Sequence, residues 1–232
     1  MSNSYFELLT GIQFFKDTPA REVQYGLSRL IAAAMSQDKA LRDLHKRNEI
    51  KKYSFCSPYP IEKDKVYRSG RLYCFNLRTP DLKFALAMKN ILPGTEGMVK
   101  VIMVELRNYQ QRFISELISL TPIICTVNNR SWLPEDGLGL LAERLQSNTL
   151  KKCRQQDPLF VTPPELFFDS IELMNRKPMV VPYKKTVLLG HKICLRIKAQ
   201  EWAQQLAFTV LSRGALEKNG QGFGYCIIGG VK

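Results

Sequence analysis

Two histidines, His45 and His191, supply the only imidazole side chains in this sequence. Imidazole titrates near neutral pH, so histidine is the side chain best suited to take up and release a proton there. His45 ends a predicted short helix over residues 39–45, where the alternative is a surface histidine whose charged form the helix dipole favours. His191 follows Gly190 in a predicted hairpin tip, where a solvated turn histidine is expected. From the residues alone, an acid/base role and a surface position both stay open for His45.

A glycine-rich stretch over residues 214–224 is the second feature that could serve a functional site. Closely spaced glycines let backbone N–H groups approach a phosphate without interference from Cβ atoms. A predicted helix precedes the stretch and a predicted strand follows it, whereas dinucleotide-binding folds need the order strand, loop, helix. No Gly-Lys-Ser/Thr ending of a phosphate loop is present. The alternative is a tight helix-to-strand turn with positive φ. We predict phosphate contacts at Arg213, Gly214, Lys218, Gly220, Gly222 and Gly224.

The charge balance points to an anionic partner. The chain has 232 residues, with 34 Lys and Arg against 21 Asp and Glu, and a formal net charge of +13. Nucleic acid is the first expectation. A membrane partner is not expected, because the sequence shows no basic amphipathic helix, no targeting leader and no apolar run of about 20 residues. The alternative is a solvated basic face that only maintains solubility.

Six cysteines lie far apart, and no pair has CxxC spacing. We expect reduced, mostly buried thiols in a cytoplasmic protein. The close ligand pairs of a structural zinc site are missing. The sequence therefore predicts no metal and no cofactor.

The order of predicted elements repeats once along the chain. Strands are predicted over residues 5–16, 53–56, 66–77 and 98–106, with helices over 19–34, 39–45 and 80–91. In the second half, strand-like runs over 113–127 (with an interruption at Thr121-Pro122), 166–197 (two or three strands) and 225–228 enclose helices over 137–153 and 200–212. Thr18 is the predicted N-cap of the first helix. The pattern predicts an α+β fold of tandem ferredoxin-like (RRM-like) domains, βαββαβ twice, over residues 1–110 and 111–232.

Several segments of the sequence resemble one known family. They are Gly214, Lys218 and Gly222-Phe223-Gly224 before a final short strand, Leu44-His45 followed by Lys51, the run Tyr53-Ser54-Phe55-Cys56-Ser57-Pro58, and Leu120-Thr121-Pro122-Ile123. Together they resemble CRISPR-associated repeat-processing endoribonucleases of the RAMP superfamily, over nearly the whole chain. Leu216 stands where the family pattern has another glycine, and Gly220 is the candidate replacement.

The resemblance implies cleavage of CRISPR repeat RNA within precursor transcripts, without a metal, to give guide RNAs. The ribose 2′-OH attacks the adjacent phosphate and leaves a 2′,3′-cyclic phosphate and a 5′-OH. His45 takes the acid/base role and Lys51 stabilises charge on the phosphate, with Lys52 expected on the opposite strand face. The tyrosine used by many members falls on Leu30, and Tyr25 lies a turn or more away. The implied catalytic pair is therefore His45 and Lys51.

Other basic residues are candidates for phosphate contacts, namely Lys184, Lys185 and Lys192 in the second domain and Arg68, Arg71 and Arg78 in the first. Tyr67 and Tyr73 have strand spacing, which fits either base stacking or core packing. The expected partners are CRISPR repeat RNA, subunits of a CRISPR effector complex and a second copy in a homodimer. One alternative is a non-catalytic RNA-binding subunit of an effector complex, and another is a general RNA-binding protein.

Overall fold

The computed structural model describes residues 4–183 and 186–230, and these form two compact units. The N-terminal unit comprises Ser4–Tyr109 together with Gly220–Gly222. The C-terminal unit comprises residues 110–219 and 223–230 of the described chain. Three residues of the glycine-rich loop therefore pack with the N-terminal unit, although they lie more than one hundred residues further along the chain.

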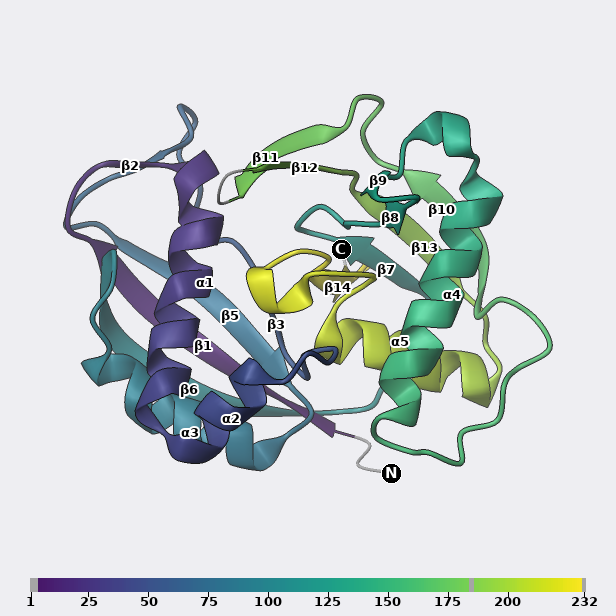
Figure 1. The fold of residues 1–232 in the computed structure, drawn as a ribbon, viewed down its shortest axis with the longest axis horizontal. Helices are drawn as coiled ribbons and strands as arrows, with labels where there is room; N and C mark the ends of the chain where they lie inside the picture. Colours follow the sequence, from purple (N-terminus) through teal and green to yellow (C-terminus); the bar gives the residue numbers. More distant parts are fainter. Residues whose placement is uncertain (1–3, 184–185, 231–232) are drawn as a thin grey trace. The chain divides into compact units, whose positions relative to one another are not determined.

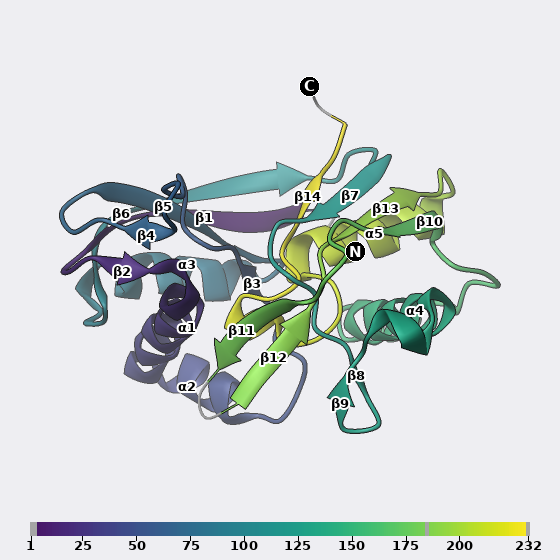
Figure 2. The ribbon, with the colours of Figure 1, turned by 90° about the horizontal axis from the view of Figure 1, so that it is seen from above.

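The N-terminal unit is a four-stranded sheet with helices on one face. Its strands are β1 (Ser4–Phe14), β2 (Thr18–Pro19), β3 (Ser54–Phe55), β4 (Val66–Tyr67), β5 (Leu72–Thr79) and β6 (Val99–Gln110). Its helices are α1 (Ala20–Gln37), α2 (Lys39–Lys46), α3 (Leu82–Ile91) and the 3-10 helix η1 (Leu92–Gly94). The strand order is β3-β5-β1-β6, and β5 pairs antiparallel with both β1 and β3. Figures 1 and 2 show α1 and α3 on the same side of this sheet.

Alternating and helical apolar patterns explain these elements. Leu8 and Ile12 of β1 are fully buried, in keeping with the period of two along a strand. Along α1, Val23, Leu27 and Ile31 recur at helical spacing and are also buried. The prediction that Thr18 caps α1 was wrong, because Pro19 is the N-cap and the Thr18 hydroxyl donates to the Lys16 carbonyl at 2.8 Å.

The C-terminal unit repeats the arrangement. Its strands are β7 (Glu116–Ser119), β8 (Thr126–Val127), β9 (Arg130–Ser131), β10 (Phe168–Leu173), β11 (Met179–Tyr183), β12 (Thr186–Gly190), β13 (Ile193–Ile197) and β14 (Cys226–Ile228). Its helices are α4 (Leu138–Arg154), α5 (Glu201–Arg213) and the 3-10 helix η2 (Pro134–Asp136). The 3-10 helix η3 (Asn219–Gln221) begins in this unit at Asn219, and its other two residues belong to the N-terminal unit. The main sheet has the order β10-β13-β7-β14, with antiparallel pairing throughout. In Figure 2, α4 and α5 lie on one side of it.

The expected α+β composition and antiparallel sheets are confirmed. The run 113–127 breaks after β7 at Thr121-Pro122, where the sequence predicts an interruption. One predicted run is divided more finely than expected. The run 166–197 contains four strands, because β11 and β12 form a separate two-stranded hairpin. The predicted helices over 137–153 and 200–212 agree with α4 and α5 to within one residue.

Tyr67 and Tyr73 belong to the core of the N-terminal unit, with exposed fractions of 1% and 0%. Their ring centroids lie 5.0 Å apart in a T-shaped contact, and Phe14 stacks on Tyr67 at 5.1 Å. The Tyr67 hydroxyl donates to the Pro58 carbonyl at 2.8 Å. Core packing is therefore the correct interpretation of these two tyrosines, and base stacking is not.

Candidate active site

His45 lies in the last turn of α2 with an exposed side chain. The helix begins at the N-cap Asp38, whose carboxylate accepts from the Leu41 backbone N–H at 2.9 Å. Partial desolvation, followed by the positive charge of Lys51, lowers the pKa of His45 from its ordinary value of 6.5. An exposed imidazole with a lowered pKa is neutral at physiological pH and is able to accept a proton from a substrate.

Lys51 closes the end of the same helix. Its Nζ donates to the backbone carbonyls of Leu44 at 3.0 Å, His45 at 2.8 Å and Arg47 at 2.7 Å. The last carbonyls of a helix have no partner within the helix, and a lysine ammonium satisfies them while opposing the negative end of the dipole. Desolvation lowers the pKa of Lys51, and the charge of Glu49 opposes that change. Lys51 therefore positions the backbone that carries the imidazole.

The expected strand alternation of Lys51 and Lys52 does not apply, because both residues precede β3, which begins at Ser54. The Lys52 carbonyl accepts from the Thr79 hydroxyl at 2.8 Å. Leu30, at the position where the resemblance places a tyrosine, is 1% exposed and belongs to the core.

The tip of the glycine-rich loop packs against residues of the N-terminal unit. A Cβ atom at Gly220 would lie 3.1 Å from Lys51 Cγ and 3.2 Å from the Tyr53 hydroxyl. Gln24 of α1 donates from Nε2 to the carbonyls of Gln221, at 3.3 Å, and Gly222. This contact joins the loop tip to the first helix within the same unit.

Gln24 is a site residue that the sequence analysis missed. Its side chain is 8% exposed, and its Oε1 accepts from the Ser57 hydroxyl at 2.9 Å. The sequence signal was that Gln24 follows Val23 on the apolar face of α1. A buried amide requires hydrogen-bond partners, so this position indicated a contact with another segment.

Glycine is required in this loop by contacts within the protein itself. Gly222 has φ +87°, and a Cβ atom there would lie 1.9 Å from Gln24 Nε2 and 2.6 Å from Phe55 Cε2. Gly224 has φ +66°, and its Cβ would lie 2.1 Å from the Ala215 carbonyl oxygen. The tight-turn alternative therefore accounts for these glycines, whose Cα atoms face protein atoms. Phosphate contact through their N–H groups stays a prediction.

Two arginines predicted to contact phosphate are buried instead. Arg213 is 0% exposed and donates to the Lys152 carbonyl and to Gln155 Oε1. Arg78 is 7% exposed, pairs with Glu7 at 2.5 Å and lies 5.3 Å from the Tyr5 ring centroid. In this structure neither guanidinium is accessible to a phosphate, so both predictions are corrected.

The remaining basic candidates have mixed environments. Arg68 forms ion pairs with Asp17, at 2.9 Å, and Asp64. Arg71 pairs with Glu62 at 2.6 Å. Both arginines are about half exposed and would have to exchange a carboxylate for an RNA phosphate. Lys192 and Lys218 are half-buried, and Lys218 adopts φ +58°. Lys184 and Lys185 lie outside the described residues.

His191 is 1% exposed, so the expected solvated turn histidine was wrong. Its ring meets the Trp132 ring edge-on at 5.5 Å, and its backbone bridges to Ile123. His191 is a packing residue of the C-terminal unit, and among the residues that the structure describes His45 carries the only exposed imidazole.

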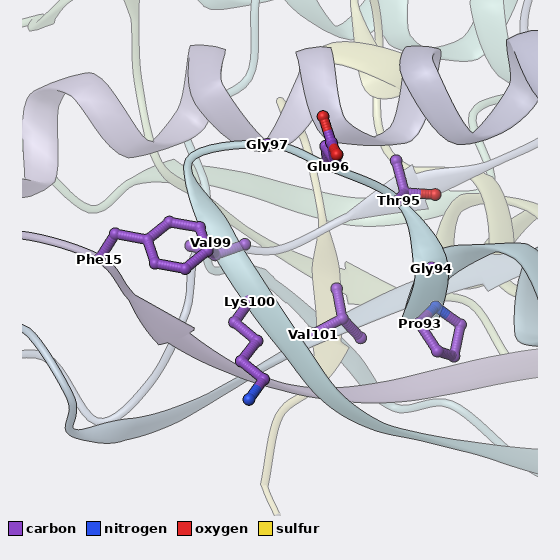
Figure 3. Close-up of a pocket in the computed structure, with 9 residues that line it drawn as sticks. All are labelled: Phe15, Pro93, Gly94, Thr95, Glu96, Gly97, Val99, Lys100 and Val101. Atoms are coloured by element: carbon purple, nitrogen blue, oxygen red, sulfur yellow. The ribbon is translucent and has the colours of Figure 1, made fainter.

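A pocket of about 430 Å³ opens beside the start of β6 (Figure 3). Its lining is formed by Phe15, Pro93, Gly94, Thr95, Glu96, Gly97, Val99, Lys100 and Val101. It includes neither His45 nor Lys51. Across residues 4–183 and 186–230, no three His, Cys, Asp or Glu side chains gather as metal ligands. In the same residues, no helix has both the length and the apolar character needed to cross a membrane.

No family model and no curated protein sequence matches this chain. Solved structures do match it. A structure described as CRISPR-associated protein Cas6 has a TM-score of 0.73 and 16% identity, covering 97% of this chain and 99% of the other. A RAMP protein described as binding different RNA substrates has a TM-score of 0.69 and 16% identity, with 96% and 99% covered. A Cas6-related protein from Pyrococcus furiosus has a TM-score of 0.66 and 16% identity, with 98% and 99% covered.

These matches show that the chain has the Cas6/RAMP fold over nearly its whole length. The resemblance to CRISPR repeat-processing RAMP proteins is thereby confirmed at the level of the fold.

Proposed function

We propose that this protein is an endoribonuclease that cleaves CRISPR repeat RNA within precursor transcripts to give guide RNAs. The observation that carries the proposal is the exposed imidazole of His45 on a helix end whose backbone Lys51 holds through three hydrogen bonds. The Cas6/RAMP fold and the net charge of +13 support RNA as the substrate.

Each compact unit is proposed to be a ferredoxin-like domain, over residues 1–110 and 111–232. The strand orders β3-β5-β1-β6 and β10-β13-β7-β14 support this, because both place the first and third strands of a βαββαβ unit at the centre. The glycine-rich loop belongs by sequence to the second domain, and its tip packs with the first.

The proposed reaction needs no metal. The ribose 2′-oxygen forms a bond to phosphorus while the bond from phosphorus to the 5′-oxygen breaks, leaving a 2′,3′-cyclic phosphate and a 5′-OH. One proton leaves the 2′-OH and one reaches the departing 5′-oxygen. The lowered pKa of His45 favours the neutral imidazole, which suits the role of general base. The positive charge of Lys51 beside it stabilises the negative charge that develops on the phosphate.

The test uses transcribed repeat RNA, from an array near the gene, in the presence of EDTA. The wild-type protein is expected to cut at one position and to leave a 2′,3′-cyclic phosphate, identified by mass spectrometry. His45→Ala is expected to bind the RNA and to cut it about 10²–10⁴-fold more slowly, whereas Lys46→Ala, its exposed neighbour in α2, is expected to cut normally. Equal cleavage by the wild-type protein and His45→Ala would remove His45 from the mechanism.

A second candidate function is a non-catalytic RNA-binding subunit of a CRISPR effector complex. Two observations favour it, namely the core residue Leu30 at the tyrosine position and the three carbonyls that accept from Lys51. This candidate predicts tight binding of repeat RNA without cleavage. A general RNA-binding protein, by contrast, would bind a scrambled RNA of equal length as tightly as the repeat.

A further inference from the structure

Lys152 is a fully buried lysine beneath the glycine-rich loop, in α4. Its Nζ donates to the Gly214 carbonyl at 2.6 Å, to the Leu216 carbonyl at 2.7 Å and to Asn219 Oδ1 at 2.6 Å. A lysine is rarely buried completely unless its ammonium group has partners. Here every partner belongs to the glycine-rich loop.

The three partners indicate that Lys152 is charged. A backbone carbonyl only accepts, and the orientation of the Asn219 amide is set by its Nδ2, which donates to the carbonyls of Ala215 and Phe223 at 2.9 Å each. Three obligate acceptors require three N–H groups, which an ammonium has and a neutral amine lacks. Burial and then the charge of Arg213 lower the pKa of Lys152 well below its ordinary value, and the charges of Cys226 and Glu217 oppose that change. The three hydrogen bonds favour the ammonium form by geometry.

The loop backbone requires such a clamp. Leu216 and Lys218 have positive φ values of +54° and +58°, which non-glycine residues rarely adopt. Conformations of this kind persist where the surrounding structure holds them. The Lys152 ammonium binds the carbonyl of Leu216 itself, and Asn219 links both ends of the loop through Ala215 and Phe223.

We propose that Lys152 is the positioning residue of the glycine-rich loop, which holds the loop in its RNA-binding shape and places a positive charge beneath the bound phosphate. The groups that accept from Lys152 are all uncharged, so its charge contributes to the potential at the loop. This inference rests on the proposed RNA-processing function and extends it to a residue that does not touch the substrate.

Lys152→Met tests the clamp, because methionine fills similar space without charge or donors. The matched control is Leu145→Ala in the same helix, which removes a fully buried side chain that has no hydrogen bond to the loop. In the RNA-free protein, Lys152→Met is expected to speed hydrogen exchange of residues 214–224 at least about tenfold, and Leu145→Ala to leave those amides near wild type.

Binding and cleavage are then measured separately with the transcribed repeat RNA. Lys152→Met is expected to raise Kd at least about tenfold while the single-turnover rate at saturating RNA stays within about threefold, and Leu145→Ala to change neither. If Lys152 had only a structural role, Lys152→Met and Leu145→Ala would change Kd and the single-turnover rate to a similar extent. If Lys152→Met does not fold, Asn219→Ala, which removes one acceptor and both loop links, is expected to give the same loop-specific exchange and weaker binding.

Unchanged loop exchange in a folded variant, or a Kd shift no larger than that of the control, would overturn the proposal. The exchange experiment contains no RNA, so its outcome is independent of the proposed function. A wild-type protein that neither binds nor cuts repeat RNA would instead contradict the proposed function, and it would not affect the hydrogen-exchange result.

Discussion

The Lys51 ammonium donates to the backbone carbonyl of His45 at 2.8 Å, so the two residues proposed for catalysis are joined through the main chain. The Lys51 side chain binds the end of helix α2, and that helix end carries the His45 side chain. This arrangement limits how far the imidazole moves relative to the cation. It also lets each residue be tested for a distinct role.

The pH dependence of cleavage is expected to follow the neutral form of His45. Because desolvation and Lys51 lower its pKa below 6.5, kcat/KM should rise with pH on the acid side, with the midpoint of the rise below pH 6.5. His45→Ala should remove this limb and reduce the rate by about 10²–10⁴-fold. Cleavage rates over pH 4.5–8.5 (about four units, spanning the ordinary histidine range) provide the measurement. A rate that falls as pH rises through this range would assign His45 an acid role instead.

Substitution of Lys51 is expected to affect cleavage more than stability. Lys51→Met leaves three carbonyls at the end of α2 to water, and because the site is partly exposed the free energy of unfolding should fall by only about 1 kcal/mol. The single-turnover rate should fall at least about tenfold, since both the helix end and the positive charge are disturbed. Lys52→Met is the matched control and should retain the wild-type rate. Urea unfolding and cleavage assays measure the two effects, and equal rates for the two variants would contradict the assignment.

A methyl group at Gly222 is expected to disrupt the loop tip. Gly222→Ala forces a Cβ atom against Gln24 and Phe55 at a φ of +87°, so the free energy of unfolding should fall by about 2–4 kcal/mol. Gly70→Ala is the control, because Gly70 also has positive φ, +71°, and no atom lies within 4 Å of its Cβ position. That variant should lose only about 1 kcal/mol, for the left-handed backbone. Equal losses in urea unfolding would show that the Gln24 contact is unimportant.

At position 216, a glycine variant is expected to be more stable than an alanine variant, although alanine is usually the more stable substitution. Both Leu216→Ala and Leu216→Gly lose the burial of a side chain that is 1% exposed, which costs about 1.5–3 kcal/mol. Only glycine relieves the left-handed conformation at φ +54°, by about 1 kcal/mol. Leu216→Gly should therefore unfold at a higher urea concentration than Leu216→Ala. The opposite order would mean that the backbone at this position is not strained.

Much of the architecture was predictable from local patterns. The apolar spacing in α1 and the alternation in β1 depend on residues within a few positions of one another, so both can be predicted from the sequence. The glycine-rich loop was located in the same way. The separate β11–β12 hairpin was harder to place, because it depends on which strand each run pairs with.

The environment of individual polar side chains was decided by the tertiary structure. Lys52 and Lys51 are neighbours of the same type, yet it is Lys51 whose ammonium meets the carbonyls of α2. Arg213 looked like an exposed basic residue and proved to be buried.

The sequence by itself determined the element order, the basic character and the positions of His45 and the glycine-rich loop, because these follow from residue type and short-range spacing. Only the tertiary structure decided that Gln24 holds the loop tip and that Lys152 lies beneath the loop. Gln24 and Gln221 are 197 positions apart, and Lys152 and Gly214 are 62 apart. Burial and hydrogen bonding at such separations arise from packing between elements, so the local periodicity of the sequence does not predict them.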